Sequence, residues 1–99
     1  MDIREQLAGC VGFEWDEGNA DKNLEKHGVS DAECEQIFFN DPLVVGEDHE
    51  HSRGEPRGFA LGHTDGRRYL FVVFTVRRAL IRVISARDMT KVERRRYGS

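Results

Sequence analysis

The sequence lacks the features that mark membrane, secreted and disulfide-stapled proteins. A membrane-spanning helix needs a run of about 18 apolar residues, and no apolar run in this 99-residue sequence approaches that length. The N-terminus lacks the basic start and the apolar stretch of a secretory signal peptide. Only two cysteines are present, Cys10 and Cys34, and they form neither a CxxC motif nor a disulfide-rich pattern. We therefore expect a protein of the cytoplasm.

Length and composition indicate a single folded domain. Hydrophobic residues make up 38% of the chain and charged residues 33%, which is the balance of a globular domain with a heavily charged surface. A chain of 99 residues leaves little room for a second domain. We interpret residues 1–12, which contain two glycines, as a leader, and residues 13–99 as the domain.

Charge is distributed unevenly between the two halves of the chain. Residues 1–51 hold 14 acidic residues against three basic residues, and residues 52–99 hold 12 basic residues against four acidic residues. The net charge of −3 therefore divides into −11 and +8. Eleven of the 12 basic residues in the second half are arginines, whose planar guanidinium group suits phosphate. The asymmetry favours a half that faces a polyanion, although a solvated surface with internal ion pairs would also produce it.

Capping and turn signals divide the chain into helices and strands. Residues 30–33 (SDAE) and 90–93 (TKVE) are capping boxes, so a helix is expected after each. Asp16 is a good N-cap for an earlier helix that runs to His27, with Gly28 as the residue that follows its end. Apolar patterns predict strands at 13–15, 43–45, 59–62, 69–76 and 80–86. The predicted order is β-α-α-β-β-β-β-α, an α+β domain in which a small antiparallel sheet carries two N-terminal helices and one C-terminal helix.

The four histidines and one lysine are candidates for chemistry. Lys26 and His27 lie at the end of the first predicted helix, where His27 can exchange protons and Lys26 can hold a phosphate. A simpler interpretation is that these cations interact favourably with the helix macrodipole. His49, His51 and His63 suggest a metal, but the sequence has neither an HExxH motif nor a Cys/His ligand set, so we expect no metal site.

The second half of the chain carries candidate phosphate ligands. Glu55 and Arg57 are two positions apart and would point to one face of an extended chain, although a surface ion pair is the simpler interpretation. Arg82 lies within a strand that is apolar on both sides, so it needs a partner or a cleft. Arginines beside an aromatic residue suit RNA, whereas a helix C-terminus that favours cations would also explain those of the last helix. The residues considered for RNA binding are Ser85, Arg87, Arg94, Arg95 and Tyr97.

Several short segments, taken in order, resemble one known family. They are Phe13-Glu14-Trp15-Asp16, Asn23-Leu24-Glu25-Lys26-His27-Gly28-Val29-Ser30, Phe38 with Asp41-Pro42-Leu43, His51-Ser52, Gly54-Glu55, Arg57, Gly62, Arg82-Val83-Ile84-Ser85-Ala86-Arg87, and Glu93-Arg94 leading to Tyr97. In this order and spacing they resemble the BrnT family of toxins. Two positions depart from the usual pattern of that family, since Pro56 replaces a charged residue and Gly58 a bulkier one.

The resemblance implies a fold, an activity and a partner. The fold would be RelE-like, a small twisted antiparallel sheet that carries helices. The activity would be that of a ribonuclease that needs no cofactor, cuts RNA and slows growth. A BrnA-like antitoxin with a ribbon-helix-helix domain would neutralise it in a hetero-oligomer, and promoter DNA would be bound only through that complex.

Residue types and the resemblance together suggest roles in RNA cleavage. Arg57 and Arg82 would stabilise charge on the phosphate. His27 or Glu55 would be the base, and His51 the acid. Lys26 would bind a phosphate or favour the charged form of a neighbouring acid. Two other interpretations remain, a non-catalytic RNA- or protein-binding module and a degenerate toxin kept as a co-repressor.

Overall fold

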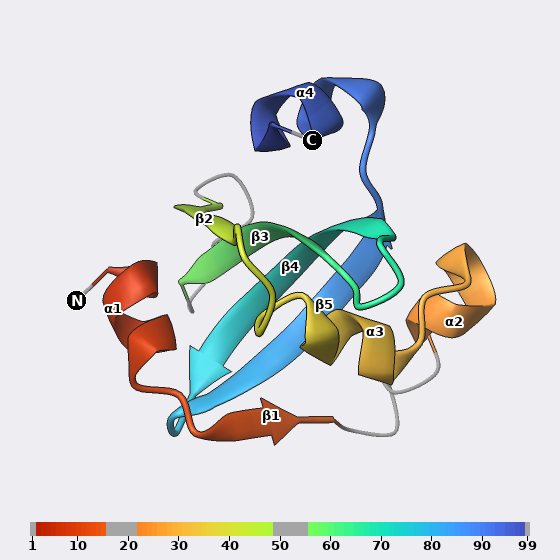
Figure 1. The fold of residues 1–99 in the computed structure, drawn as a ribbon. Helices are drawn as coiled ribbons and strands as arrows, with labels where there is room; N and C mark the ends of the chain where they lie inside the picture. The colour runs from red at the N-terminus through yellow and green to blue at the C-terminus, as the bar shows by residue number, and fades with distance from the viewer. Residues whose placement is uncertain (1, 16–21, 49–55, 99) are drawn as a thin grey trace.

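The computed structural model describes residues 2–15, 22–48 and 56–98. In chain order its elements are α1 (Ile3–Ala8), β1 (Gly12–Glu14), α2 (Lys22–His27), α3 (Asp31–Gln36), β2 (Val44–Glu47), β3 (Arg57–His63), β4 (Tyr69–Arg77), β5 (Leu80–Asp88) and α4 (Lys91–Tyr97) (Figure 1). The α+β class and the predicted order from the first strand onward are confirmed. No helix in these described ranges is long and apolar enough to cross a membrane.

The five strands form one sheet in the order β1-β5-β4-β3-β2. Strands β2 to β5 pair antiparallel with their neighbours, as their short connections predict. Strand β1 differs from the expected antiparallel arrangement, because it pairs in parallel with β5. The rule that strands consecutive in the chain tend to pair could not predict this contact, since β1 and β5 are not joined by a hairpin and lie far apart in the sequence.

Predicted caps start two of the four helices that the structure describes. Ser30 accepts a hydrogen bond from the Glu33 amide while the Glu33 carboxylate accepts one from the Ser30 amide, so α3 begins with a complete capping box. Thr90 and Glu93 make the same reciprocal pair at α4. Helix α4 ends at Gly98, whose φ of +79° is the left-handed conformation that glycine adopts without strain.

One face of the sheet packs against α1 and α3 and forms the main core, which Figure 1 shows from the helix-covered side. Phe74, at the centre of β4, is fully buried there. Two glycines of β3 allow the helices to approach this face. A side chain at Gly58 would meet Ile3 of α1, and a side chain at Gly62 would meet Ile37, the residue after α3.

The leader is part of this core. Ile3 is 2% exposed and packs against the sheet, and the Arg4 guanidinium donates two hydrogen bonds, of 3.0 and 2.8 Å, to the Val45 carbonyl of β2. Gly58 therefore fits this chain because Ile3 occupies the space that a bulkier residue would need.

Candidate functional site

The face of the sheet away from the core, here called the open face, carries a row of polar residues. Arg57 on β3 pairs with Thr75 on β4, Thr75 pairs with Arg82 on β5, and Arg82 pairs with Glu14 on β1. Residues directly opposite one another point to the same side of a sheet. The four side chains, here called the arginine row, therefore stand side by side. Since strands are about 4.8 Å apart, the Cα atoms of the two arginines are about 10 Å apart.

Hydrogen bonds hold the arginine row in place. The Thr75 hydroxyl donates to the Pro56 carbonyl at 2.9 Å, which fixes the chain just before Arg57. The Arg82 Nη1 donates to Glu14 Oε1 at 3.4 Å, and the Arg82 side chain is 26% exposed. Arg82 thus finds the partner that its apolar strand requires and still reaches solvent. Two positioned guanidinium groups on one face can bind a phosphate between them.

An irregularity in β5 brings a third arginine to the open face. Arg82 and Arg87 are five positions apart, so strict alternation would point them to opposite faces. The register shifts between Val73 and Phe74, and Ile84 is the extra residue of the resulting β-bulge. Arg87 therefore stands on the same face as Arg82, opposite Phe71 of β4.

Beside the arginine row lies a pair of aromatic rings. Phe59 and Phe71, here called the aromatic pair, stack with centroids 5.9 Å apart and planes inclined by 16°. The Arg87 guanidinium lies 4.2 Å from the centre of the Phe71 ring. It also forms a fork with both carboxylate oxygens of Glu93, at 2.7 and 2.9 Å. This hydrogen bonding lowers the pKa of Glu93 and raises that of Arg87, so the ion pair braces α4 against the sheet.

Helix α4 is anchored by Tyr97. The ring is 6% exposed, and its hydroxyl donates to the Pro42 carbonyl. Since that single proton is used, His63 Nδ1, 2.8 Å from the same oxygen, must carry a proton and donate. Arg94 lies 4.2 Å above the Tyr69 ring. Of the residues expected to bind RNA, Tyr97 thus has an anchoring position, whereas Arg94 and Arg95 are exposed on α4.

Lys26 and His27 lie at the exposed C-terminal end of α2, beside the outer edge of β5. Asn23 of the same helix accepts a hydrogen bond of 3.0 Å from the Ala86 amide, so α2 continues the cover that β1 gives to this edge. The His27 carbonyl is tied through Arg68 to Asp88. Asp88 lies about 17 Å along the strand from Arg82. The structure therefore places Lys26 and His27 at the other end of β5 from the arginine row.

Arg68 organises that end of the molecule and was missed by the sequence interpretation. Its guanidinium donates to Asp88 at 2.7 and 3.0 Å, to the Gly28 carbonyl at 2.7 Å, and to Glu33. Hydrogen bonding from Arg68 lowers the pKa of Asp88. Burial alone would raise the pKa of Glu33, but hydrogen bonds from Ser30 and Arg68 outweigh it and lower the value.

The structure thus brings some of the expected site residues together and separates others. Arg57, Arg82 and Arg87 share the open face. Ser85 lies between Arg82 and Arg87 along β5, in the row of paired residues (here called a tier) that contains Val73. His51 and Glu55 lie outside the described residues, as does His49. Within residues 2–15, 22–48 and 56–98, there is no group of three or more His, Cys, Asp or Glu side chains that could hold a metal ion.

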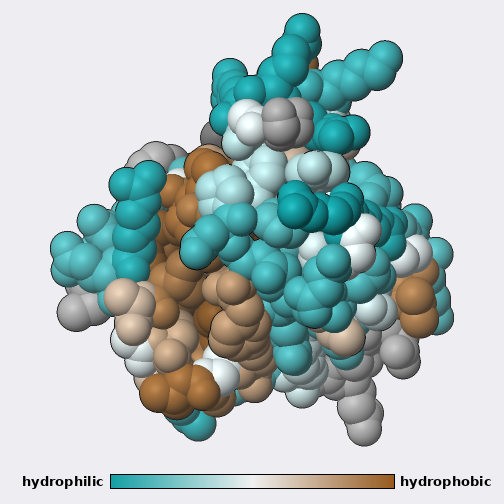
Figure 2. Space-filling model, viewed as in Figure 1, coloured by the Kyte–Doolittle hydropathy of each residue, from teal (hydrophilic) through white to brown (hydrophobic). Residues whose placement is uncertain are grey.

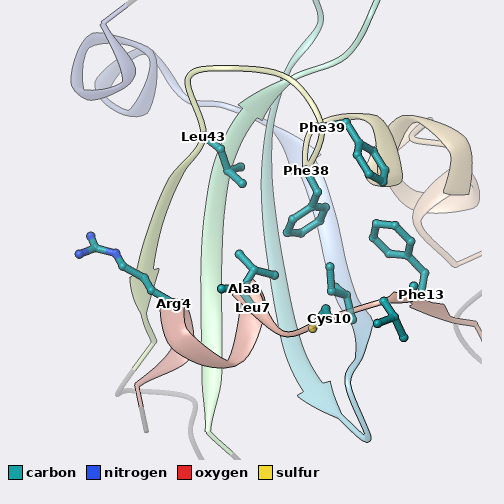
Figure 3. A pocket seen from close by; sticks show the side chains of 11 residues that line it. Arg4, Leu7, Ala8, Cys10, Phe13, Phe38, Phe39 and Leu43 are labelled. Carbon is teal, nitrogen blue, oxygen red and sulfur yellow. The ribbon is translucent and has the colours of Figure 1, made fainter.

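A hollow of about 420 Å³ lies on the helix-covered side between α1, β1 and the segment after α3. Figure 2 shows apolar surface gathered there, and Figure 3 shows Phe13, Phe38 and Phe39 turned toward one another around it. Phe39 is 78% exposed. Among the residues that line the hollow, Arg4 is the charged one, and its guanidinium donates hydrogen bonds to the Val45 carbonyl. This hollow suits an apolar group rather than a phosphate.

Comparison with known proteins gives a family and a similar solved structure. Residues 15–93 match the family model described as the ribonuclease toxin BrnT of type II toxin–antitoxin systems. The crystal structure of the ribonuclease toxin BrnT from Brucella abortus is similar, with a TM-score of 0.60 and 24% sequence identity over 82% of this chain and 99% of that chain. At this identity the second match shows a shared fold. No curated protein sequence matches the chain.

Proposed function

Because this chain belongs to the BrnT family of ribonuclease toxins of type II toxin–antitoxin systems, we propose that it cleaves RNA in the cytoplasm without a metal ion. The arginine row carries the proposal. Arg57 and Arg82 flank Thr75 on the open face, where two guanidinium groups can bind the phosphate to be cleaved. RNA supplies its own nucleophile, the 2′-hydroxyl, so positioning, charge stabilisation and two proton transfers suffice.

The proposed step is a transesterification within the RNA. The 2′-oxygen attacks phosphorus, the 2′-O–P bond forms and the P–O5′ bond breaks, which leaves a cyclic phosphate and a free 5′-hydroxyl. Negative charge grows on the non-bridging phosphate oxygens during this step. Arg57 and Arg82 stabilise that charge, because preorganised donors cost little reorganisation when the reaction occurs. Glu14 holds the Arg82 guanidinium in position.

Two proton transfers complete the step. A base takes the proton of the 2′-hydroxyl, and an acid gives one to the leaving 5′-oxygen. Of the two candidate bases, Glu55 is favoured over His27, because Glu55 is two residues from Arg57 in the chain while His27 lies at the far end of β5. His51 is the proposed acid.

Residues beyond the arginine row would bind the rest of the RNA. Ser85 and Arg87 lie farther along the open face, and Arg94 and Arg95 lie on α4 above it. Lys26 is exposed at the other end of β5 and would bind a phosphate of the RNA away from the one at the arginine row. Tyr97 contributes by holding α4 over this end of the face.

Membership of a type II toxin–antitoxin family implies an antitoxin partner. We propose that this partner is a BrnA-like protein with a ribbon-helix-helix domain that forms a hetero-oligomer with the chain. Promoter DNA would be bound through the antitoxin in that complex. Release from the antitoxin would free the open face for RNA.

The test is cleavage of labelled RNA in EDTA by four proteins purified in the same way: the unaltered chain, Arg82→Ala, Arg82→Lys and Lys91→Ala. Lys91 is exposed on α4, so its variant controls for the loss of one positive charge. We expect Arg82→Ala to cleave about 10²–10³ times more slowly, with little rescue in Arg82→Lys because lysine lacks the planar fork. Lys91→Ala should cleave normally.

Two results would contradict the proposal. Equal cleavage by all four proteins would indicate a contaminating nuclease or a site elsewhere. Binding of RNA without cleavage, in the presence and absence of ribosomes, would favour a non-catalytic RNA-binding module or a degenerate toxin kept as a co-repressor.

A further inference from the structure

The aromatic pair lies in the tiers of the open face next to the arginine row. Phe59 is two residues after Arg57 on β3, so about 7 Å separates the two positions along the strand. Both Phe59 and Phe71 are half-buried. They pack against the small cluster formed by Leu61, Met89 and Tyr97 beneath α4. These two rings therefore remain partly in contact with solvent on the face that also carries Arg57, Arg82 and Arg87.

The Phe59 ring lies across the neighbouring strand. A side chain at Gly46 of β2, the residue paired with Phe59, would stand 2.5 Å from the Phe59 Cζ atom. The ring therefore leans from β3 over the glycine and occupies the space that a Cβ atom would fill. Phe71 stacks nearly parallel to the Phe59 ring on the side toward β4, and the Arg87 guanidinium lies against Phe71. The side of the Phe59 ring away from Phe71 is therefore the one on which a further flat group can stack.

We propose that Phe59, supported by Phe71, is a stacking platform for one RNA base. The proposal rests on the proposed function, in that it takes the arginine row as the phosphate site. Each base presents a flat apolar face to which an aromatic ring can stack. Phe59 and Arg57 are about 7 Å apart along the strand, so a base on Phe59 and a phosphate at Arg57 would belong to the same short stretch of RNA.

The platform has two structural supports. Gly46 leaves room for the Phe59 ring to lie across β2. The fork between Arg87 and Glu93 holds the Arg87 guanidinium 4.2 Å from the centre of the Phe71 ring. The guanidinium therefore covers Phe71 on the side away from Phe59, where a base would otherwise stack. The base therefore stacks on Phe59, the ring nearer to Arg57. Stacking contacts the flat face of a base and makes no hydrogen bonds to its edge. The platform therefore positions the RNA without selecting a particular base.

The experiment measures binding of a short RNA that carries a 2′-O-methyl group at every position, so cleavage cannot occur and a failed ribonuclease proposal does not affect the readout. Single abasic positions are moved along this RNA. The proteins are the unaltered chain, Phe59→Leu, Phe59→Tyr, Gly46→Ala and Arg57→Ala. Leucine keeps apolar volume without a ring, tyrosine keeps the ring, and alanine at Gly46 displaces the ring without changing it.

We expect Phe59→Leu to bind intact RNA about 10-fold more weakly, and Phe59→Tyr to bind it as the unaltered chain does. One abasic position should weaken the unaltered chain by a similar factor and Phe59→Leu by almost nothing. Gly46→Ala should behave as Phe59→Leu does. The salt dependence should be unchanged in Phe59→Leu, whereas Arg57→Ala should reduce the slope of log affinity against log salt by about 1.

Two results would overturn the platform. In the first, Phe59→Leu binds intact RNA as tightly as the unaltered chain does. In the second, Phe59→Leu keeps its full defect relative to the unaltered chain at every abasic position, which would indicate a structural role. If Gly46→Ala does not fold, as judged by its thermal transition, the comparison of Phe59→Leu with Phe59→Tyr decides between the platform and its rejection.

Discussion

Replacing Arg68 with methionine should loosen the attachment of α2 and α3 to the sheet. The guanidinium joins Asp88 of β5 to the Gly28 and His27 carbonyls after α2 and to Glu33 of α3. Methionine keeps much of the apolar stem of arginine but removes all of these hydrogen bonds. The variant therefore tests whether one side chain holds this corner of the fold together.

The expected loss follows from the individual contacts. Each of the two hydrogen bonds to backbone carbonyls contributes about 1 kcal/mol net. The Arg68 and Asp88 side chains are 29% and 60% exposed, so solvent screening limits their ion pair to at most about 1 kcal/mol. A total near 2 kcal/mol should lower the midpoint of thermal unfolding by about 10 °C for a domain of this size.

The assay is thermal unfolding followed by circular dichroism at several pH values. Arg68 lowers the pKa of Asp88 in the folded state, so this contribution is present above the unfolded pKa of about 4 and is lost as pH falls through the folded value. The difference between the unaltered chain and Arg68→Met should therefore shrink below about pH 4. Arg96→Met, which removes an exposed arginine of α4, is the matched control and should change little. Equal midpoints for the unaltered chain and Arg68→Met at pH 7 would refute the reasoning.

Three further predictions concern packing, a buried hydrogen bond and thiol reactivity. Gly62→Ala should lose about 1–3 kcal/mol of unfolding free energy in urea titration, because its Cβ would stand 2.8 Å from a buried isoleucine side chain. Gly12→Ala is the milder control, since its Cβ would stand 3.4 Å from the nearest atom. Equal losses in the two variants would contradict the packing argument. Asn23→Ala should lose about 1–3 kcal/mol in the same titration because it leaves a β5 amide without its acceptor, and an unchanged midpoint would show that the bond adds no stability. Burial raises the pKa of the Cys34 thiol to about 12, so a thiol reagent should modify Cys10 in the native protein and Cys34 only after unfolding; rapid modification of both would contradict the burial of Cys34.

Local signals in the sequence were sufficient for the order of the elements. The capping boxes at residues 30–33 and 90–93 start helices because they satisfy amides within one turn, which the sequence alone shows. The extra helix α1 and the parallel pairing of β1 with β5 were not predicted. Helix α1 does carry a local signal that was not used, because the Asp2 side chain caps the Glu5 amide. The parallel pairing of β1 with β5 depends on contacts between distant segments, for which no local pattern exists.

The candidate site was predictable in its residue types and less so in its arrangement. Arg82 stood out because a charged side chain in an apolar strand requires a partner. Its alignment with Arg57 could not be foreseen, because it depends on the registers of three strands. The bulge at Ile84 could not be predicted from the sequence either, because it arises from the pairing of β4 with β5. Its one extra residue decides which face of the sheet Arg87 occupies. Arg68 was missed because its side-chain partners lie 20 and 35 residues away in the sequence.

The most direct test of the arginine row is a double-mutant cycle on single-turnover cleavage of one RNA, with the unaltered chain, Arg57→Ala, Arg82→Ala and the double variant. If both guanidinium groups stabilise one phosphate, each single variant should cleave about 10²–10³ times more slowly. The double variant should then lose much less than the product of the two factors, because residues that act as a unit are strongly non-additive. Cleavage at the unaltered rate by either single variant, or losses that multiply, would contradict a shared phosphate site at Arg57 and Arg82.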